Sequence, residues 1–235
     1  MRVVFGVFLL LAYPAMAEQV VDTFDDGTNP NQWTWTNDLG IDVGEVIHDG
    51  GNPGGWFDSQ PLYFSKHPAV HSYGPFGSAV RDALASGTLV SASIDFQRLD
   101  TSGENNCHPI YDLPSHFSIT FIDQHTVPTT PLTTIAAYTT GIASPLQGPF
   151  PWMTVTFAIP SAATDVPPGW TLIAPPDITY TWTDMMHNID AVGFGVVDPD
   201  DITYSSCWHL GVDNIVLNYG GDDDVFANGF DAASD

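Results

Sequence analysis

The fold of this chain is indicated most clearly by residues 88–99, which read TLVSASIDFQRL. Within this stretch four apolar side chains alternate with four polar ones: Val90, Ala92, Ile94 and Phe96 against Ser91, Ser93, Asp95 and Gln97. Alternation with a period of two is typical of a strand that buries one face and exposes the other to water. The stretch therefore predicts a half-buried β-strand.

Similar strand patterns recur along the chain. We expect further strands at residues 20–24, 33–36, 42–48, 116–122, 153–159, 178–183, 192–197 and 212–217. Residues 184–189 predict one helical turn capped by Asp184, and no long amphipathic helix is evident. Short strands joined by loops rich in Pro and Gly predict an all-β fold, an antiparallel β-sandwich of the jelly-roll type.

The closing strand is expected within residues 207–217, which read CWHLGVDNIVL. Its aliphatic residues occupy both alternating registers, so the pattern does not assign an inward face. Asp213 lies in the middle of this run. A carboxylate buried there needs a hydrogen-bond partner or a metal ion.

Both ends of the chain differ in composition from the middle. Residues 1–17 combine a basic start, a short apolar run and the small residues Ala15 and Ala17, which is typical of a signal peptide. The alternative is a retained membrane anchor, although the apolar run is too short to cross a bilayer. We expect residues 18–219 to form one β-sandwich domain and residues 220–235 to be an acidic C-terminal tail. The protein is then secreted or held at the cell surface, with no membrane span.

The charge balance is strongly acidic. Four Lys and Arg residues face 28 Asp and Glu residues, and the net charge is −24. Such a surface excludes nucleic acid and anionic membrane as partners, because binding to them requires neutralised phosphates. Most acidic residues simply need water, but clustered ones favour a cation, for which Ca²⁺ is the usual extracellular choice.

The only two cysteines are Cys107 and Cys207. An even number of cysteines in an exported chain predicts one disulfide, with two buried free thiols as the alternative.

Residues 59–77 are predicted to form a long, irregular and aromatic loop, which is typical of functional loops. His67 and His71 are excluded as a helical zinc pair because Pro68 separates them. The aromatic candidates for ligand binding are Tyr63, Tyr73, Tyr111 and Trp170. We expect the remaining prominent tryptophans to lie in the core: Trp33, Trp56, Trp152 and Trp182.

Several segments together resemble a family of extracellular modules. They are FDDG at 24–27, GNPGGW at 51–56, IDF at 94–96, PWMTVTFAIP at 151–160, MHNIDAV at 186–192 and LGVDNIVL at 210–217. Their order resembles laminin-B-like modules and galactose-binding-like jelly rolls, which include many carbohydrate-binding modules. In the latter, the resemblance implies a structural Ca²⁺ joining the first and last strands. Carried over to this chain, its carboxylate ligands would be Asp25 and Asp213.

Three functions are compatible with these observations. The first is a non-catalytic binding or adhesion module for extracellular glycan or a cell-surface component, with aromatic rings against sugar faces. The second is a glycan-cleaving enzyme, which needs a pair of carboxylates, although no acidic pair has a recognisable strand spacing. The third is a surface-display protein without a ligand. We favour the first, without catalysis.

Overall fold

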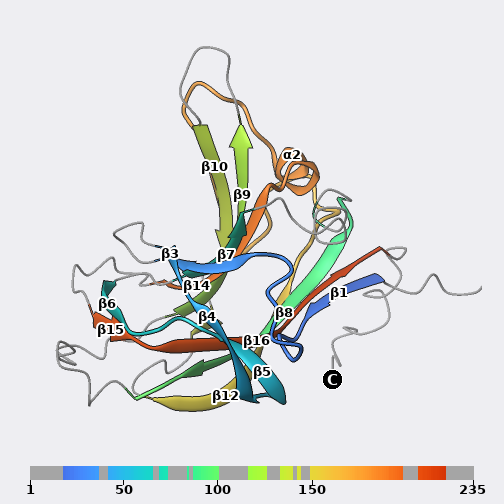
Figure 1. Ribbon diagram of the computed structural model, residues 1–235. Coiled ribbons are helices and arrows are strands. Elements are labelled where there is room, and N and C mark those ends of the chain that lie inside the picture. The colour runs from blue at the N-terminus through green and yellow to red at the C-terminus, as the bar shows by residue number, and fades with distance from the viewer. Residues whose placement is uncertain are drawn as a thin grey trace, which may run out of the picture.

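The computed structural model describes residues 18–36, 42–65, 69–73, 84, 87–100, 116–125, 133–139, 142–143, 149–197 and 206–220. They form two large antiparallel sheets that pack face to face (Figure 1), so the predicted all-β antiparallel sandwich is confirmed. The predicted signal peptide and all of the tail beyond residue 220 lie outside the described residues. Among the described residues, no helix has the length and apolar character needed to cross a membrane.

Sheet A has six strands in the order β12-β8-β16-β5-β4, with β1 also paired to β16. Its elements are β1 (Glu18–Asp22), β4 (Glu45–Gly51), β5 (Gly54–Asp58), β8 (Leu89–Arg98), β12 (Phe150–Ala158) and β16 (Leu210–Tyr219). The stretch that read most clearly as a strand is thus β8, between β12 and β16.

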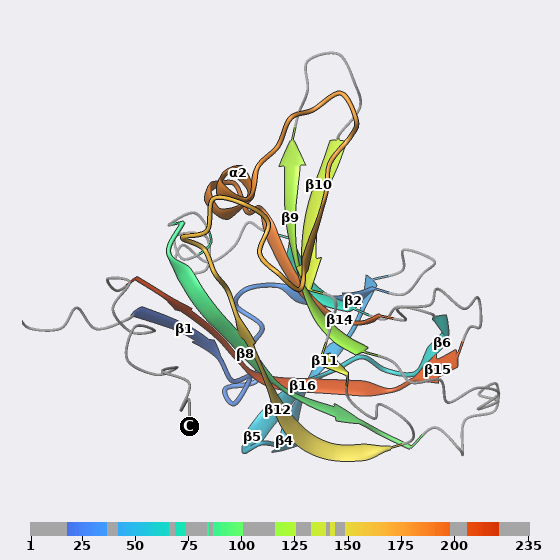
Figure 2. The ribbon, with the colours of Figure 1, turned by 180° about the vertical axis from the view of Figure 1, so that it is seen from behind.

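Sheet B has eight strands in the order β13-β10-β9-β14-β7-β2-β3, with β11 also paired to β9. Its elements are β2 (Trp33–Thr36), β3 (Asp42–Val43), β7 (Ala69–Tyr73), β9 (His116–His125), β10 (Thr133–Thr139), β11 (Ile142–Ala143), β13 (Trp170–Ile173) and β14 (Ala191–Val197). A separate pair is formed by β6 (Leu62–Ser65) and β15 (Ser206–Trp208). Figure 2 shows the two large sheets from behind.

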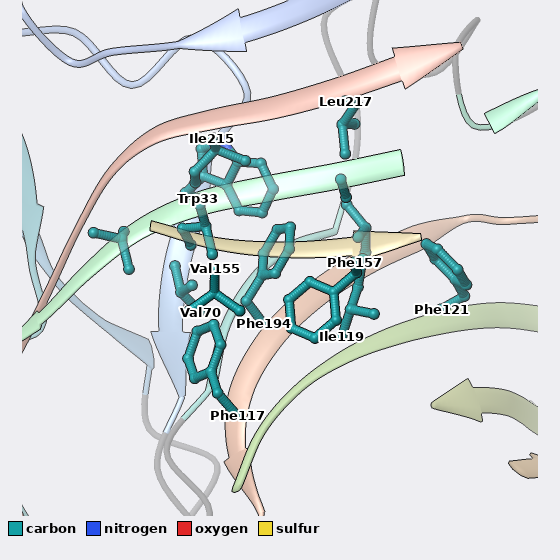
Figure 3. Close-up of a cluster of buried hydrophobic side chains, with 14 of the residues drawn as sticks. Trp33, Val70, Phe117, Ile119, Phe121, Val155, Phe157, Phe194, Ile215 and Leu217 are labelled. Atoms are coloured by element: carbon teal, nitrogen blue, oxygen red, sulfur yellow. The ribbon is translucent and has the colours of Figure 1, made fainter. Parts of the chain in front are cut away.

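The hydrophobic core lies between sheets A and B. Phe157 of β12 packs against Phe117 and Phe194 of sheet B, with ring centroids 6.2 and 6.1 Å apart. Figure 3 shows this cluster, in which side chains of both sheets point toward one another. Because successive strand residues point to opposite faces, these contacts also identify the residues on the outer faces.

A β-bulge in β16 explains why the closing strand carries apolar residues in both registers. The pairing with β8 shifts between Asp213 and Val216, and Asn214 has a φ of 45°. Before the bulge Leu210 and Val212 are buried, and after it the buried residues are Ile215 and Leu217. The extra residue thus moves the inward register by one position.

Two predictions about secondary structure were wrong. Residues 178–183 form no strand: α2 (Trp182–His187) begins there, and its N-cap is Thr181, with Asp184 completing the capping box. A capping box needs the hydroxyl residue three positions before the acid, and Thr181 satisfies that spacing. Residues 59–77 are not wholly irregular either, because they contain β6 and β7, and β7 lies between β14 and β2 in sheet B.

Candidate functional site

The outer face of sheet B carries one row of residues that crosses six strands. Cross-strand pairing links each member to the next, and the row reads Thr34, His71, Gly193, Thr120, Tyr138 and Thr171, from β2, β7, β14, β9, β10 and β13. We call it the central row. Its members alternate along their strands with buried core residues such as Trp35, Val70 and Phe121, so the row faces away from the core.

The outer face of sheet B is depressed at the middle of the central row, because β14 has glycines there instead of larger side chains. In the segment Val192–Val196 large buried residues alternate with Gly193 and Gly195. A Cβ on Gly193 would find its three nearest atoms in β7, the closest being the Cβ of His71 at 3.2 Å. The backbone of β14 therefore forms the floor of the face at this point.

Two further rows flank the central row. On one side lie polar and small residues, paired in the order Asp42, Thr36, Ala69, Gly195 and Ser118. On the other side the paired residues are apolar: Ala191, Ile122, Ala136 and Ile173. The face thus has a polar flank and an apolar flank.

Hydrogen bonds order the polar part of this face. The Oγ1 of Thr36 lies 3.1 Å from the Nε2 of His71. The Oγ of Ser118 lies 3.1 Å from the Oγ1 of Thr139 and donates to the Thr139 carbonyl at 3.0 Å. These bonds hold the Thr36 and Ser118 side chains in place, and Ser118 is itself buried at 1% exposure.

The described side chains on this outer face include no Asp, Glu, Lys or Arg. The acidic residue of β9 in that region, Asp123, is 4% exposed, has the parity of the core residues and accepts a hydrogen bond from the Tyr180 hydroxyl. In a chain with 28 acidic residues, a sheet face whose described side chains include no carboxylate is distinctive; the acidic residue in register with it, Asp42, lies at the β3 end of the polar flank. The described side chains of the face include several hydroxyls, the imidazoles of His71 (7% exposed) and His116, and the phenol ring of Tyr138.

Three of the four predicted ligand-binding aromatics are on described strands, and each is on a different one. Tyr63 lies on β6 and Tyr73 on β7, opposite Ala191. Trp170 begins β13, where its ring stacks on Phe121 at 5.5 Å and packs against the core. Tyr111 lies outside the described residues. Only Tyr73 is on a strand that contributes to the middle of the outer face of sheet B.

A second polar cluster lies on the outer face of sheet A, at the hairpin between β4 and β5. Asp213 accepts hydrogen bonds from the backbone N–H groups of Asn52 and Asn214, both at 2.7 Å. Asp95 accepts from the side-chain amides of the same two asparagines, at 3.2 and 2.7 Å. Asp25 accepts from the Gly55 N–H at 3.0 Å. We call Asp25, Asp95 and Asp213 the carboxylate cluster.

Asp213 is the most strongly perturbed carboxyl of this cluster. Asp213 is fully buried, with 0% of its surface exposed. Burial raises the pKa of Asp213 to about 6, the two backbone N–H bonds lower it, and the charges of Asp25 and Asp95 raise it further. Burial is the largest of these effects, because it disfavours the charged form.

The predicted calcium ligands Asp25 and Asp213 therefore lie in one cluster: Asp213 is on β16, and Asp25 follows β1, the strand that pairs with β16. Carboxylate and carbonyl oxygens are the ligands that Ca²⁺ prefers. However, no group of three or more His, Cys, Asp or Glu residues in the described part of the chain is arranged to hold a metal ion. Calcium at Asp25 and Asp213 stays a prediction.

The tryptophans assigned to the core from sequence are not all there. Trp33 and Trp182 belong to the core cluster and Trp56 is buried at 8% exposure, whereas Trp152 is only half-buried. Trp56 and Trp152 pack edge to face at 5.9 Å, and their Nε1 groups donate to the carbonyls of Asp49 and Gly50, each at 3.1 Å. The prediction failed for Trp152, because its ring packs over Trp56 and the β4–β5 hairpin on the outer face of sheet A.

A third group of polar residues lies farther along sheet A. The Nε2 of His209 is 2.8 Å from the Oδ1 of Asp58, and Asp58 lies opposite Glu45 in the β4–β5 pair. The Gln60 side chain donates to both carboxylates. These carboxylates are occupied by donors from the chain itself.

The two cysteines are only partly placed. Cys207 lies on β15, while Cys107 lies outside the described residues. The disulfide between them stays a prediction.

Comparisons with known proteins find distantly similar solved structures. No family model matches the sequence, and no curated protein matches it. One solved structure with a similar fold is the family 11 carbohydrate-binding module of a cellulosomal cellulase of Clostridium thermocellum. It is 12% identical, has a TM-score of 0.49, and the alignment covers 86% of this chain and 95% of that one.

Two other solved structures have lower TM-scores. The family 28 carbohydrate-binding module specific for non-crystalline cellulose is 14% identical, with a TM-score of 0.39 and coverage of 83% of this chain and 91% of that one. An arabinose-bound α-L-arabinofuranosidase is 11% identical, with a TM-score of 0.36 and coverage of 88% and 26%. These likenesses concern the arrangement of strands in an antiparallel β-sandwich.

Proposed function

We propose that this protein is a secreted, non-catalytic binding module for extracellular glycan, and that the glycan lies on the outer face of sheet B. The observation that carries the proposal is the central row, which carries hydroxyl, imidazole and phenol groups and has no carboxylate or ammonium group among the described side chains of the rows beside it. The predicted signal peptide supports export, after which the module would act in the medium or at the cell surface.

The chemistry of the central row matches that of a sugar. Thr34, Thr120 and Thr171 offer hydroxyls that both donate and accept hydrogen bonds, as sugar hydroxyls do. Tyr138 is partly exposed and adds an aromatic ring with a polar end, which buries apolar area at little cost in side-chain entropy. Sites that bind small polar ligands combine these two elements.

The face does not suit glycan cleavage. Glycoside hydrolysis uses two carboxyl groups about 5 to 9.5 Å apart. None of the side chains described on this outer face is a carboxylate. The role that fits the face is therefore binding without bond cleavage.

The proposal is tested with the chain from residue 18 onward on a panel of neutral polysaccharides, by pull-down and by calorimetry. We expect binding to at least one polysaccharide, lost or strongly weakened by Tyr138→Ala and weakened by Thr120→Ala. Thr156→Ala is the matched control, because Thr156 is exposed on the outer face of sheet A. Absence of binding across the panel would refute the proposal, as would equal loss in the control.

A further inference from the structure

We infer that the glycan is an uncharged linear chain, bound by an internal stretch that lies across the strands of sheet B along the central row. This inference rests on the proposed function and adds the class of ligand and its direction. It follows from the length of the row, from its two ends and from the difference between its flanks.

The length of the central row exceeds one sugar ring. Six strands contribute one residue each, and neighbouring strands are about 4.8 Å apart, so five intervals span roughly 24 Å. A single terminal sugar would contact only two or three of these strands. A row of this length can hold several pyranose units in line.

Both ends of the row reach an edge of sheet B. Thr171 lies on β13, the last strand on that side. Thr34 lies on β2 before the two residues that pair with β3, which are Trp35 and Thr36. Within the described residues the sheet therefore provides no further strand to stop a chain at either end. A polymer can enter at one edge and leave at the other.

The two flanks give the row a direction. The polar flank places Thr36 and Ser118 beside it, and the apolar flank places Ile122 and Ile173 on the opposite side. Ile173 is 52% exposed, an unusual value for a large apolar residue in this structure. A sugar chain has hydroxyl-rich edges and apolar ring faces. If the chain runs along the row, its hydroxyl groups can contact the polar flank while its apolar ring faces contact the apolar flank.

Charge selects the class of glycan. The face offers no Lys or Arg among its described side chains, and the chain as a whole carries a net charge of −24. A uronate or a sulfated glycan would be repelled over a distance of about 10 Å at moderate salt and would meet no cation on arrival. The ligand should therefore be uncharged.

The first experiment measures affinity against chain length, using the neutral oligosaccharide series from whichever polysaccharide binds. We expect affinity to rise from the disaccharide through at least the tetrasaccharide and then to level off. Borohydride reduction of the polymer end should leave binding unchanged. A monosaccharide or disaccharide that binds as tightly as the hexasaccharide would overturn the inference while leaving the proposed function standing.

The second experiment tests the two ends of the row. Thr34→Ala and Thr171→Ala should each weaken hexasaccharide binding by roughly two- to tenfold, the loss expected for one hydrogen bond, while disaccharide binding is unchanged. Thr120→Ala, in the middle, should weaken both ligands. Unchanged hexasaccharide affinity in both end variants would overturn the direction that we assign.

The third experiment tests charge with polygalacturonate and a neutral polysaccharide that binds. We expect no binding of polygalacturonate at low salt. Binding to it as tight as to the neutral polymer would contradict the assigned class. If neither polymer binds, nor any other glycan, the proposed function itself fails.

Discussion

The backbone N–H of Asn52 donates a hydrogen bond of 2.7 Å to the Oδ2 of Asp213, although 161 residues separate the two in sequence. The bond joins the tip of the β4–β5 hairpin to the bulge of β16. Asn52 also bonds Asp95 through its side chain. One residue of a turn is thus held by two acids from neighbouring strands, and the hairpin is fixed across the outer face of sheet A.

Substitution of Gly54 should show how strongly this hairpin depends on Asp25. Gly54 has a φ of +87°, and a Cβ there would lie 1.9 Å from the Oδ1 of Asp25. Gly169 has a similar φ of +82° but no atom within 4 Å of the added Cβ. Alanine in this conformation costs about 1–2 kcal/mol, which is all that we expect for Gly169→Ala.

Gly54→Ala should cost more, because Asp25 must move and lose its bond to the Gly55 N–H. A hydrogen bond to a charged group contributes about 1.5–3 kcal/mol, so we expect Gly54→Ala to be destabilised by at least that much beyond Gly169→Ala. Urea unfolding of both variants gives the difference. Equal losses would mean that Asp25 does not support the hairpin.

The stability of the protein should decrease as pH rises through the titration of Asp213. In the unfolded chain this carboxyl has a pKa of 3.8, and in the folded protein burial raises the pKa to about 6. The folded state therefore holds the proton more tightly, and the free energy of unfolding falls between pH 3.8 and pH 6. A shift of this size corresponds to at most about 3 kcal/mol.

This prediction is checked by urea unfolding from pH 4 to pH 7 in the presence of a chelator. Asp213→Asn should remove the decrease. Asp26→Asn is a control for a pH effect of opposite sign. Hydrogen bonds from Thr28 lower the pKa of Asp26, so the stability that Asp26 contributes is lost as pH falls. An Asp213→Asn variant with the same pH profile as the original protein would contradict the assignment.

Calcium should raise the melting temperature if Asp25 and Asp213 bind it. An ion that binds only the folded state stabilises the protein according to its concentration relative to Kd. We expect the melting temperature to rise with Ca²⁺, to fall in EDTA and to respond less to Mg²⁺, which requires a tighter octahedral geometry. Asp25→Asn should abolish the response. An identical melting curve in EDTA and in Ca²⁺ would rule out a tight structural site.

The predicted disulfide can be tested directly. If Cys107 and Cys207 are joined, they close a loop of about 100 residues, which in the chain-entropy model stabilises the fold by up to about 4.7 kcal/mol. We expect a faster mobility in non-reducing electrophoresis that reductant abolishes. Cys107→Ser and Cys207→Ser should both lack the shift. Detection of two free thiols in the unfolded, unreduced protein would refute the bond.

The sequence predicted the sandwich because strands such as residues 88–99 alternate strictly. It did not predict β7, since only five residues of a longer aromatic stretch form that strand and Pro68 precedes it. The inward face of β16 could not be assigned either, because a bulge is set by pairing with β8 rather than by local pattern. Register of this kind depends on neighbouring strands.

The candidate site was predicted less well than the fold. Attention to large aromatic side chains favoured Trp170, which packs against the core, and overlooked Gly193, where the informative feature is a missing side chain. The alternation of large residues with glycine in residues 192–196 was the available signal. Asp25 and Asp213 do lie in one cluster, Asp25 just after β1 and Asp213 on β16, and calcium binding by the pair stays a prediction.

The bulge at Asn214 makes β16 two half-strands of opposite phase within one element. The first half presents Asp213 to the hairpin, and the second half presents Ile215 and Leu217 to the core. Deleting Asn214 would restore a single phase in which Ile215 and Leu217 still face the core, whereas keeping Asn214 without the bulge would turn Val216 and Asn218 toward the core and Leu217 to water. The polar cluster and the core are therefore separated by one inserted residue, which lets each half of the strand vary in sequence without disturbing the orientation of the other.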